Sequence, residues 1–540
     1  MKNHKTTDGI ALAKKQKHFK KSTYAKQLNV DSRPTTMRSR QFKTERTKHQ
    51  DTDHINGTSM KKHREQNRHS NYERNNSYIL EDSHNIKQSK LKNRPNPNIE
   101  RGLKEPTNYN AMFKKTGSYY SKQAKNQISN KNLIEIVNEF KLPKDMRLDR
   151  FRIMLHDFEM FHTQSLLKVD VMTMKTPIFL SNYKTPCWLA PLTEHDVIPN
   201  RQLKWASRMR DMIKHMTPLW IERLRRRVNY KIKCLPYVYL IGFPKCGTTD
   251  MIHRLHRHPD VAMSKKEFHW WTKMRAPKAK GNTSLCHYTD LFNEAAEIVK
   301  ESTYIGTQGP NANYFHKKII IDGSPSTVFN CSLEDFDEGG PMRIIADDIR
   351  HVQGNKSKFI VMLRDPVERL YSEFIFFRKS HPDEEVNPNI FDEMARKGIR
   401  LFNDCLESHS LRMCVYKSDL QLEHSFRLVL GIYHIYLRDW IKVVGDDLLP
   451  VVLEEFVEDK TKTMTAIFDH LNIERLHPLH MDGLGLLSKE GVNGVKQKYE
   501  KYGEMLPETR TLLEGFYAEY NKELEKTLGR KLIHWEYKTT

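Results

Sequence analysis

The chain has 540 residues, a formal net charge of +23 and seven cysteines. At about 150 residues per domain, this length allows three or four domains, and the core can be large enough to fold without disulfides. The mean hydropathy is −0.72, and no apolar run reaches the roughly 20 residues that cross a bilayer. A multi-span membrane protein and a disulfide-built scaffold are therefore excluded, whereas the charge favours a polyanionic partner.

Most of the charge lies in residues 1–130, which hold 29 Lys and Arg against 11 Asp and Glu. Their net charge is +18, and the other 410 residues carry +5. The apolar residues of this segment follow neither a helical nor a strand period, so we predict a disordered basic tail or stem. A loose tether to a polyanion and a wrongly assigned start of the gene are alternatives. The basic start is not followed by the roughly 7–15 apolar residues of a signal peptide, and no membrane anchor is evident.

Residues 131–230 read as a helical and irregular flanking region. The segments 133–137 and 148–167 mix charged and apolar residues at helix-compatible spacing. Four prolines follow between residues 177 and 199, and then a basic helical stretch over residues 221–228. That stretch could form a nucleic-acid face, but a solvated helix flank is the simpler interpretation.

From Leu235 the pattern changes, and we predict one α/β domain over 231–540. Short apolar strands are expected at 237–241, 318–321, 359–363 and 450–453. Helices are expected at 249–257, 366–378, 418–444, 461–471 and 507–527. Short, fully apolar strands that alternate with helices indicate a central parallel sheet flanked by helices.

The first motif, residues 242–249, reads Gly-Phe-Pro-Lys-Cys-Gly-Thr-Thr and joins a predicted strand to a predicted helix. The first N–H groups of a helix bind anions such as phosphate. Gly247 permits close approach of the backbone, Thr248 and Thr249 add hydroxyl groups, and Lys245 adds a positive charge. The Walker A order is absent, because Lys245 precedes Gly247. An ordinary strand-to-helix turn is the alternative.

The second motif, residues 358–372, again passes from a strand through a turn into a helix. Pro366 suits a first helical position. Arg364 stands at the carboxyl end of the strand, where open α/β sheets bind ligands. With the hydroxyl of Ser372 two turns later, its forked guanidinium suits a second phosphate.

Arg369 and the strand that ends at Asp322 are expected to have structural roles. We expect Arg369 to pair with Asp365 or Glu368. The strand that ends at Asp322 is similar to the Mg²⁺-binding strand that accompanies a Walker A motif. Because that motif is absent, we expect no metal site there.

Together the two motifs resemble the 5′-phosphosulfate loop and the 3′-phosphate motif of the sulfotransferases that use 3′-phosphoadenosine 5′-phosphosulfate (PAPS), in particular their Golgi carbohydrate branch. The resemblance covers roughly residues 180–535. It is carried, in order, by Lys184–Trp188, Cys234–Asp250, Lys266–Trp271, Asp322–Thr327, Tyr502–Arg510 and Phe516–Asn521. It implies a P-loop-NTPase-like sulfotransferase fold and PAPS as co-substrate without a required metal. The implied acceptor is a glycosaminoglycan hydroxyl in the Golgi lumen, namely the 6-position of N-acetylgalactosamine 4-sulfate in chondroitin or dermatan sulfate.

The resemblance also implies roles by position. Lys245 would contact the phosphosulfate and stabilise the leaving phosphate, while Arg364 and Ser372 would hold the 3′-phosphate. The full implied set of cofactor-binding residues is Lys245, Cys246, Gly247, Thr248, Thr249, Arg364 and Ser372. A free thiol is expected at Cys246 because a disulfide there would obstruct the loop, and packing is favoured over a nucleophilic role.

On the acceptor side, Glu267 matches the general base of the family, which a weakly nucleophilic sugar hydroxyl needs. A surface carboxylate is the alternative. His269 is a rival base, a substrate contact or a packed histidine. Trp270 and Trp271 would stack on sugar rings or belong to the core, and Ser324 lies in the implied acceptor-side loop.

The sequence departs from the family pattern at two places inside the domain. Phe268 stands where the branch commonly has proline, so the shape of that loop is open. Residues 488–499 occupy the region of a late basic cofactor loop, and no residue there is assigned a role.

The cysteines are at 187, 234, 246, 286, 331, 405 and 414, without any CxxC pair, so a zinc site is not expected. With Cys246 free, six remain to pair, and Cys405 with Cys414 closes a short loop. Sequons at Asn282, Asn330 and Asn355 fit a lumenal glycoprotein.

Two rival functions remain open. One is a P-loop kinase or NTPase, and the other is an inactive protein that binds glycans, nucleic acid or another polyanion through its basic tail. For the favoured function, no nucleic-acid partner is expected.

Overall fold

The computed structural model describes residues 130–142, 148–166, 170–197, 207–264, 267–275, 284–305, 314–331, 336–380, 385–417, 426–488, 501–535 and 537. The predicted tail up to residue 129 and residues 489–499 of the late basic loop lie outside the described residues. Among the helices that are described, none is both long and apolar enough to cross a membrane.

The centre of the fold is a sheet of five parallel strands in the order β11-β10-β3-β7-β4. Its strands are β3 (Val238–Gly242), β4 (Val261–Ala262), β7 (Ile319–Asp322), β10 (Lys358–Leu363) and β11 (Leu448–Val452). The predicted α/β class and all four predicted strands are confirmed, each within two residues. The fifth strand, β4, escaped prediction because two residues show no period.

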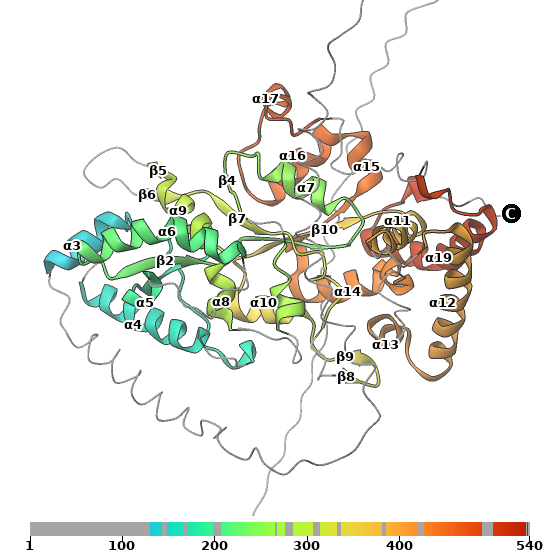
Figure 1. The fold of residues 1–540 in the computed structure, drawn as a ribbon, viewed down its shortest axis with the longest axis horizontal. Coiled ribbons are helices and arrows are strands. Elements are labelled where there is room, and N and C mark those ends of the chain that lie inside the picture. The colour runs from blue at the N-terminus through green and yellow to red at the C-terminus, as the bar shows by residue number, and fades with distance from the viewer. Residues whose placement is uncertain are drawn as a thin grey trace, which may run out of the picture. The chain divides into compact units, whose positions relative to one another are not determined.

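Helices cover both faces of this sheet. Figure 1 shows α7 (Thr248–Leu255) and α16 (Lys460–His470) on one side of the strands. The helices α10 (Ile345–Gln353) and α14 (Tyr433–Val444) lie on the other side. This arrangement leaves the strand ends, and the loops that follow them, as the accessible part of the sheet.

Most predicted helices are confirmed, including α11 (Pro366–Arg378), which begins at the proline, and α19 (Pro507–Leu528), which ends at a left-handed Gly529. The long helix expected over 418–444 is wrong over residues 426–432, because Leu428–Gly431 forms a 3₁₀ turn and α14 begins at Tyr433. Residues 418–425 of that prediction lie outside the described residues. A Cβ on Gly431 would lie 2.6 Å from Tyr517 and 2.8 Å from Pro366. Close packing against α19 and α11 therefore shapes this segment locally.

The other elements surround the sheet. The remaining α-helices are α3 (Asn130–Glu139), α4 (Leu148–Ser165), α5 (Glu194–Val197), α6 (Ser207–Arg225), α8 (Leu285–Asp290), α9 (Asn293–Glu301), α12 (Pro388–Ser408), α13 (Leu411–Tyr416), α15 (Leu453–Glu458) and α17 (Pro478–Gly483). Antiparallel pairs join β1 (Cys187–Pro191) to β2 (Tyr230–Cys234), β5 (Thr303–Ile305) to β6 (Tyr314–His316), and β8 (Phe336–Asp337) to β9 (Gly340–Pro341). Short turns of 3₁₀ helix lie at Val171–Thr173, Gly445–Asp447 and Ile533–Trp535, and Trp270–Met274 is a π-helix.

Two disulfides stabilise the described part of the chain. The predicted bond between Cys405 and Cys414 is confirmed and joins α12 to α13. A second bond joins Cys187 to Cys234, which face each other in the β1–β2 pair. The expectation that six cysteines pair is wrong, because Cys286 and Cys331 are free, as is Cys246.

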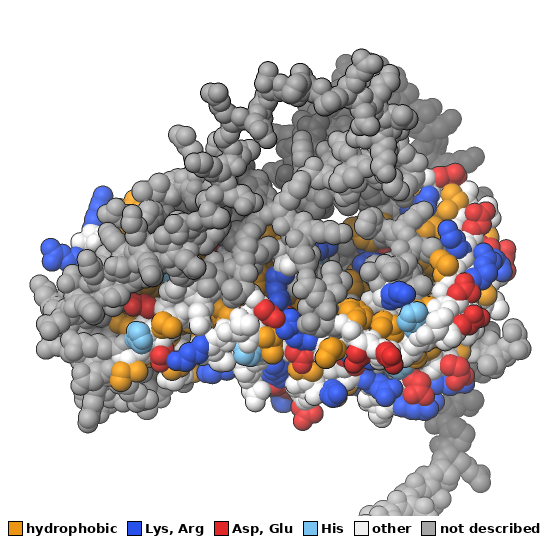
Figure 2. Space-filling model, turned by 90° about the horizontal axis from the view of Figure 1, so that it is seen from below, with side chains coloured by type: hydrophobic (Ala, Val, Ile, Leu, Met, Phe, Trp, Pro, Cys, Tyr) orange, Lys and Arg blue, Asp and Glu red, His pale blue; other side chains and the backbone are white. Residues whose placement is uncertain are grey.

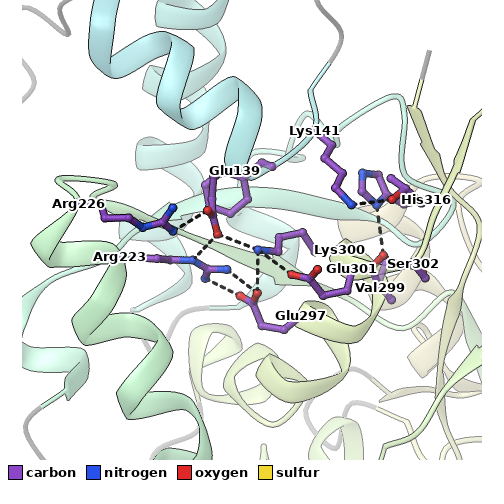
Figure 3. Close-up of polar contacts among 12 residues, drawn as sticks. Glu139, Lys141, Arg223, Arg226, Glu297, Val299, Lys300, Glu301, Ser302 and His316 are labelled. Carbon is purple, nitrogen blue, oxygen red and sulfur yellow. Dashed lines mark hydrogen bonds and ion pairs between the residues drawn. The ribbon is translucent and has the colours of Figure 1, made fainter. Parts of the chain in front are cut away.

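A buried ion network ties α3, α6 and α9 together (Figure 3). Arg223 has a fully buried side chain and contacts Glu297 at 2.5 and 2.7 Å and Glu139 at 3.1 Å. Lys300 lies 2.8 Å from Glu139. Burial alone would raise the pKa of Glu139, but hydrogen bonds from Lys300 and Arg226 bring it down to about 2. Arg223 thus lies inside the fold, and only its neighbours fit the predicted solvated flank.

Because a broken buried ion pair leaves an uncompensated charge, we expect Arg223→Met to lower the free energy of unfolding by about 3–5 kcal/mol. Arg226→Met is the matched control. Its half-exposed guanidinium contacts the same Glu139 at 2.7 Å, so the loss should stay below about 1 kcal/mol. Urea unfolding of both variants provides the measurement, and equal losses would contradict this account of the network.

Candidate active site at the carboxyl edge of the sheet

Four loops meet at one edge of the sheet, because strands β10, β3, β7 and β4 are neighbours and all run parallel. The carboxyl ends of such strands form the ligand-binding edge of an open α/β sheet. The phosphate-loop motif follows β3, and the arginine motif follows β10. The loop at 322–328 follows β7, and the segment with Glu267 follows β4. The sheet order therefore gathers every predicted site segment at one place.

The loop between β3 and α7 contains two residues with left-handed backbone. Gly247 has a φ angle of 84°, which a glycine adopts without strain, and Lys245 has a φ angle of 69° although it carries a side chain. A Cβ on Gly247 would lie 2.8 Å from a terminal methyl of Leu453, so that side chain would have to shift to admit any other residue. Thr248 and Thr249 are the first residues of α7, where backbone N–H groups favour an anion.

The two phosphate motifs are in direct contact. A guanidinium nitrogen of Arg364 donates to the backbone oxygen of Lys245 at 3.3 Å. The ammonium of Lys245 lies 3.7 Å from the ring centre of Phe376. Ser372 precedes Phe376 by four residues on α11, so both side chains share one face of that helix. The structure thus brings Lys245, Arg364 and Ser372 to one place.

Cys246 faces the interior from the same loop. Its side chain is fully buried, its sulfur lies 3.8 Å from the hydroxyl of Tyr433, and its N–H donates to the oxygen of Phe243. Burial raises the pKa of the Cys246 thiol to about 12, so thiolate is scarce near neutral pH. The free thiol is confirmed, and these contacts give it a packing role instead of a ligand contact.

Tyr433 contacts two of the loops that form the site. Its hydroxyl donates to the oxygen of Arg364 at 2.8 Å, while it also approaches Cys246. One buried phenol therefore joins the loop after β3 to the loop after β10. The sequence held no signal for this residue, because a tyrosine in an apolar helix reads as ordinary core.

The prediction for Arg369 is half wrong. The residue is structural, but its partners are the buried carboxylate of Glu373 at 3.0 Å and the backbone oxygen of Arg427 at 2.8 Å. Asp365 instead caps α11 by accepting from the N–H groups of Val367 and Glu368. Helix spacing explains the error, because an i,i+4 partner downstream was as available as one upstream.

On the acceptor side, Glu267 and His269 form a hydrogen-bonded pair. Nε2 of His269 lies 3.3 Å from Oε2 of Glu267, and its Nδ1 lies 2.7 Å from Oγ of Ser326. That hydroxyl also lies 2.8 Å from Oγ1 of Thr272. Both ring nitrogens of His269 are therefore engaged, and its ring is fixed relative to the carboxylate. Ser326 and Thr272 were missed, because single hydroxyl residues carry no motif.

Ser324 binds the backbone of the turn that contains Phe268 and His269. Its buried hydroxyl accepts from the N–H groups of Phe268 and His269 at 3.0 and 2.9 Å and donates to Asp322 at 2.6 Å. The hydroxyl of Tyr288 donates to the other oxygen of Asp322. Ser324 is thus placed to position the turn, and not to touch an acceptor. Asp322 has the contacts of a structural carboxylate, and burial raises its pKa.

The tryptophans take the core alternative. Trp270 and Trp271 are 1% and 2% exposed, and the ring of Trp270 stacks on Tyr288 at 4.8 Å. Neither ring has a face on which a sugar could stack in this structure. Phe268 is also buried, with its ring 4.9 Å from that of Phe292, which explains why an aromatic residue fits where proline is common.

The acceptor-side turn and the phosphate loop form one packed unit. The N–H of Val328 donates to the oxygen of Ile241 at 2.9 Å. A Cβ on Gly242 would lie 2.3 Å from Val328, so this loop rests on the first residue of the phosphate motif. Within the described residues, no group of three or more His, Cys, Asp or Glu side chains is arranged to hold a metal.

Comparison with known proteins agrees with this geometry. Residues 235–480 match the family model described as "Sulfotransferase domain". The chain is 32% identical over 405 residues to human "Carbohydrate sulfotransferase 15", covering 71% of this chain and 70% of that protein. The mouse protein of the same name is 31% identical over 404 residues, with the same coverage. A solved sulfotransferase from Alicyclobacillus acidocaldarius covers 56% of this chain and 99% of its own, at 19% identity and a TM-score of 0.34. The chain therefore belongs to the carbohydrate sulfotransferase family.

Proposed function

We propose that this protein transfers the sulfuryl group of PAPS to a glycosaminoglycan hydroxyl, the 6-position of N-acetylgalactosamine 4-sulfate in chondroitin or dermatan sulfate. The observation that carries the proposal is the contact between the Lys245 loop and the Arg364 motif, at the edge of the sheet that also holds Glu267. Membership of the carbohydrate sulfotransferase family supports sulfuryl transfer and argues against the P-loop kinase or NTPase alternative. Likeness to "Carbohydrate sulfotransferase 15" supports a carbohydrate acceptor, and the particular sugar and position rest on the resemblance of the sequence motifs.

The donor groups at this edge fit PAPS chemically. Lys245, with Thr248 and Thr249 at the start of α7, would hold the 5′-phosphosulfate. Arg364 and Ser372 would hold the 3′-phosphate through a forked guanidinium and a hydroxyl. When bound, PAPS supplies an activated sulfuryl group, and no metal is assigned a role in the proposal.

Each protein group then has a defined task. The ammonium of Lys245 stabilises the negative charge that develops on the leaving phosphate oxygen, an interaction that strengthens in the transition state. Glu267 accepts the proton of the acceptor hydroxyl. His269 is the alternative base. In the favoured assignment, His269 orients the Glu267 carboxylate through the contact that Ser326 fixes on its other side.

The surroundings of the site support a Golgi lumenal glycoprotein. Disulfides such as Cys187–Cys234 persist in oxidising compartments. The sequon residue Asn355 is exposed, whereas Asn330 is half-buried and donates to the oxygen of Ser326. We propose residues 231–540 as the catalytic domain, with 131–230 flanking it and 1–130 as a tail or stem.

Nucleotide binding tests the cofactor assignment without needing the acceptor. We expect the protein to prefer adenosine 3′,5′-bisphosphate (PAP) over adenosine 5′-monophosphate (AMP) in calorimetry. Arg364→Ala should weaken PAP binding about 10- to 100-fold, the value of a charge-assisted contact. It should weaken AMP binding by a smaller factor, because it also removes the hydrogen bond to the Lys245 backbone. Equal affinity of the wild-type protein for the two nucleotides would argue against the proposal.

A further inference from the structure

Glu368 lies between two arginines that are far apart in sequence. Its Oε2 is 3.5 Å from a guanidinium nitrogen of Arg364, and its Oε1 is 2.6 Å from one of Arg510. Arg364 follows β10, Glu368 is in the first turns of α11, and Arg510 is in the first turn of α19. These three charges form a row that begins at the proposed 3′-phosphate site.

The carboxylate creates an electrostatic problem for that site. Arg364 is nearly buried, and its guanidinium is the proposed partner of a phosphate that carries up to two negative charges. A carboxylate within 4 Å of the same guanidinium competes for its N–H donors and repels the incoming anion. An uncompensated Glu368 would therefore weaken the binding that Arg364 provides.

The distances show how this problem is reduced. The 2.6 Å contact with Arg510 has the length of a charge-assisted hydrogen bond, whereas the 3.5 Å contact with Arg364 is at the limit of one. Burial would lower the pKa of Arg510, but its hydrogen bond and charge interaction with Glu368 raise it overall. Of the two arginines, Arg510 therefore holds the Glu368 carboxylate more closely than Arg364 does.

The helix that carries Arg510 is itself fixed against α11, beside which it lies in Figure 1. The neighbouring Thr509 donates to Asp392 of α12 at 2.6 Å. Further along α19, the buried Tyr517 donates to the oxygen of Leu428 at 2.7 Å. The start of α19 is thus anchored on both sides, so Arg510 can hold the carboxylate in a defined place.

We propose that Arg510 is a positioning residue for nucleotide binding: it keeps the carboxylate of Glu368 from occupying Arg364, which then binds the 3′-phosphate. This inference rests on the proposed function and extends it to a residue that does not touch the nucleotide. A positioning role and a direct contact with the phosphate predict different results. If Arg510 only positions Glu368, it becomes dispensable for nucleotide binding once the Glu368 carboxylate is removed.

The test is PAP and AMP binding by calorimetry for the wild-type protein, Arg510→Gln, Glu368→Gln and the double variant. We expect Arg510→Gln to weaken PAP binding about tenfold, the value of one charged contact, with AMP binding unchanged. Glu368→Gln should bind PAP at least as well as the wild type. The double variant should bind PAP within about twofold of Glu368→Gln. Lys522→Gln, an exposed change on the same helix, is the control and should match the wild type.

Each other outcome contradicts the inference in a recognisable way. A double variant as weak as Arg510→Gln would mean that Arg510 contacts the phosphate itself. Equal weakening of PAP and AMP by Arg510→Gln would show general damage to α19, and unchanged PAP binding would show no role. A wild-type protein that does not bind PAP would remove the proposed function itself, and this inference with it.

Discussion

Replacement of Lys245 by Ala should lower kcat for sulfate transfer about 100- to 1000-fold, the usual effect of removing one group that stabilises developing charge. The position of Lys245 explains this expectation. Arg364 donates a hydrogen bond to the backbone oxygen of Lys245. The ammonium of Lys245 lies over the ring of Phe376, on the face of α11 that carries Ser372. Because the proposed role of this cation is to stabilise the leaving oxygen, the loss should appear in kcat more than in PAP binding. Steady-state kinetics with labelled PAPS measures both.

Lys379→Ala is the matched control for this prediction. Lys379 also lies over the ring of Phe376, with its ammonium 5.7 Å from the ring centre, but it follows the end of α11. Its loss should change kcat by less than about twofold, as for other surface changes away from a site. Similar kcat values for the two variants would contradict a specific role of Lys245 in transfer, because any positive charge near the Phe376 ring would then have the same effect.

Replacement of Glu267 by Gln should lower kcat about 100- to 10000-fold, the range for removal of a positioned general base. Gln keeps the shape of the side chain and a hydrogen bond to His269, so nucleotide binding should stay unchanged. His269→Gln should cost less activity, because we assign His269 to orienting the carboxylate.

The comparison of these two variants decides between the rival bases. A loss in His269→Gln that exceeds the loss in Glu267→Gln would reverse the assignment. Glu301→Gln, which changes an exposed carboxylate at the end of α9, is the control and should keep full activity. Rates for all three variants are best compared at saturating PAPS and acceptor.

Local patterns predicted the elements that carry the proposed cofactor site. The strand predicted at 359–363 is a continuous apolar run, and Pro366 suits a first helical position, so α11 was predicted from its first residue. The loop after β3 was also predicted from its local pattern, because its glycine and hydroxyl residues fall between a buried strand and a helix. On the face that Figure 2 shows, basic and acidic side chains of the described residues are interspersed, in line with the small net charge of +5 outside residues 1–130.

Features made by residues far apart in the chain were not predictable. Cys187 and Cys234 are 47 residues apart, and only the β1–β2 pairing brings them together. Arg510 reaches Glu368 from 142 residues away, and neither belongs to a charge pattern. Trp270 and Trp271 read equally well as surface or core, because their burial depends on Tyr288 from a distant helix.

The transfer of labelled sulfate from PAPS to a panel of glycosaminoglycans tests the central claim most directly. The panel should contain chondroitin 4-sulfate, dermatan sulfate, unsulfated chondroitin and heparan sulfate, with disaccharide analysis of the products. We predict label at the 6-position of N-acetylgalactosamine 4-sulfate and its absence with Lys245→Ala. A protein that binds PAP but labels none of these acceptors, or that labels them equally well without Lys245, would contradict the account.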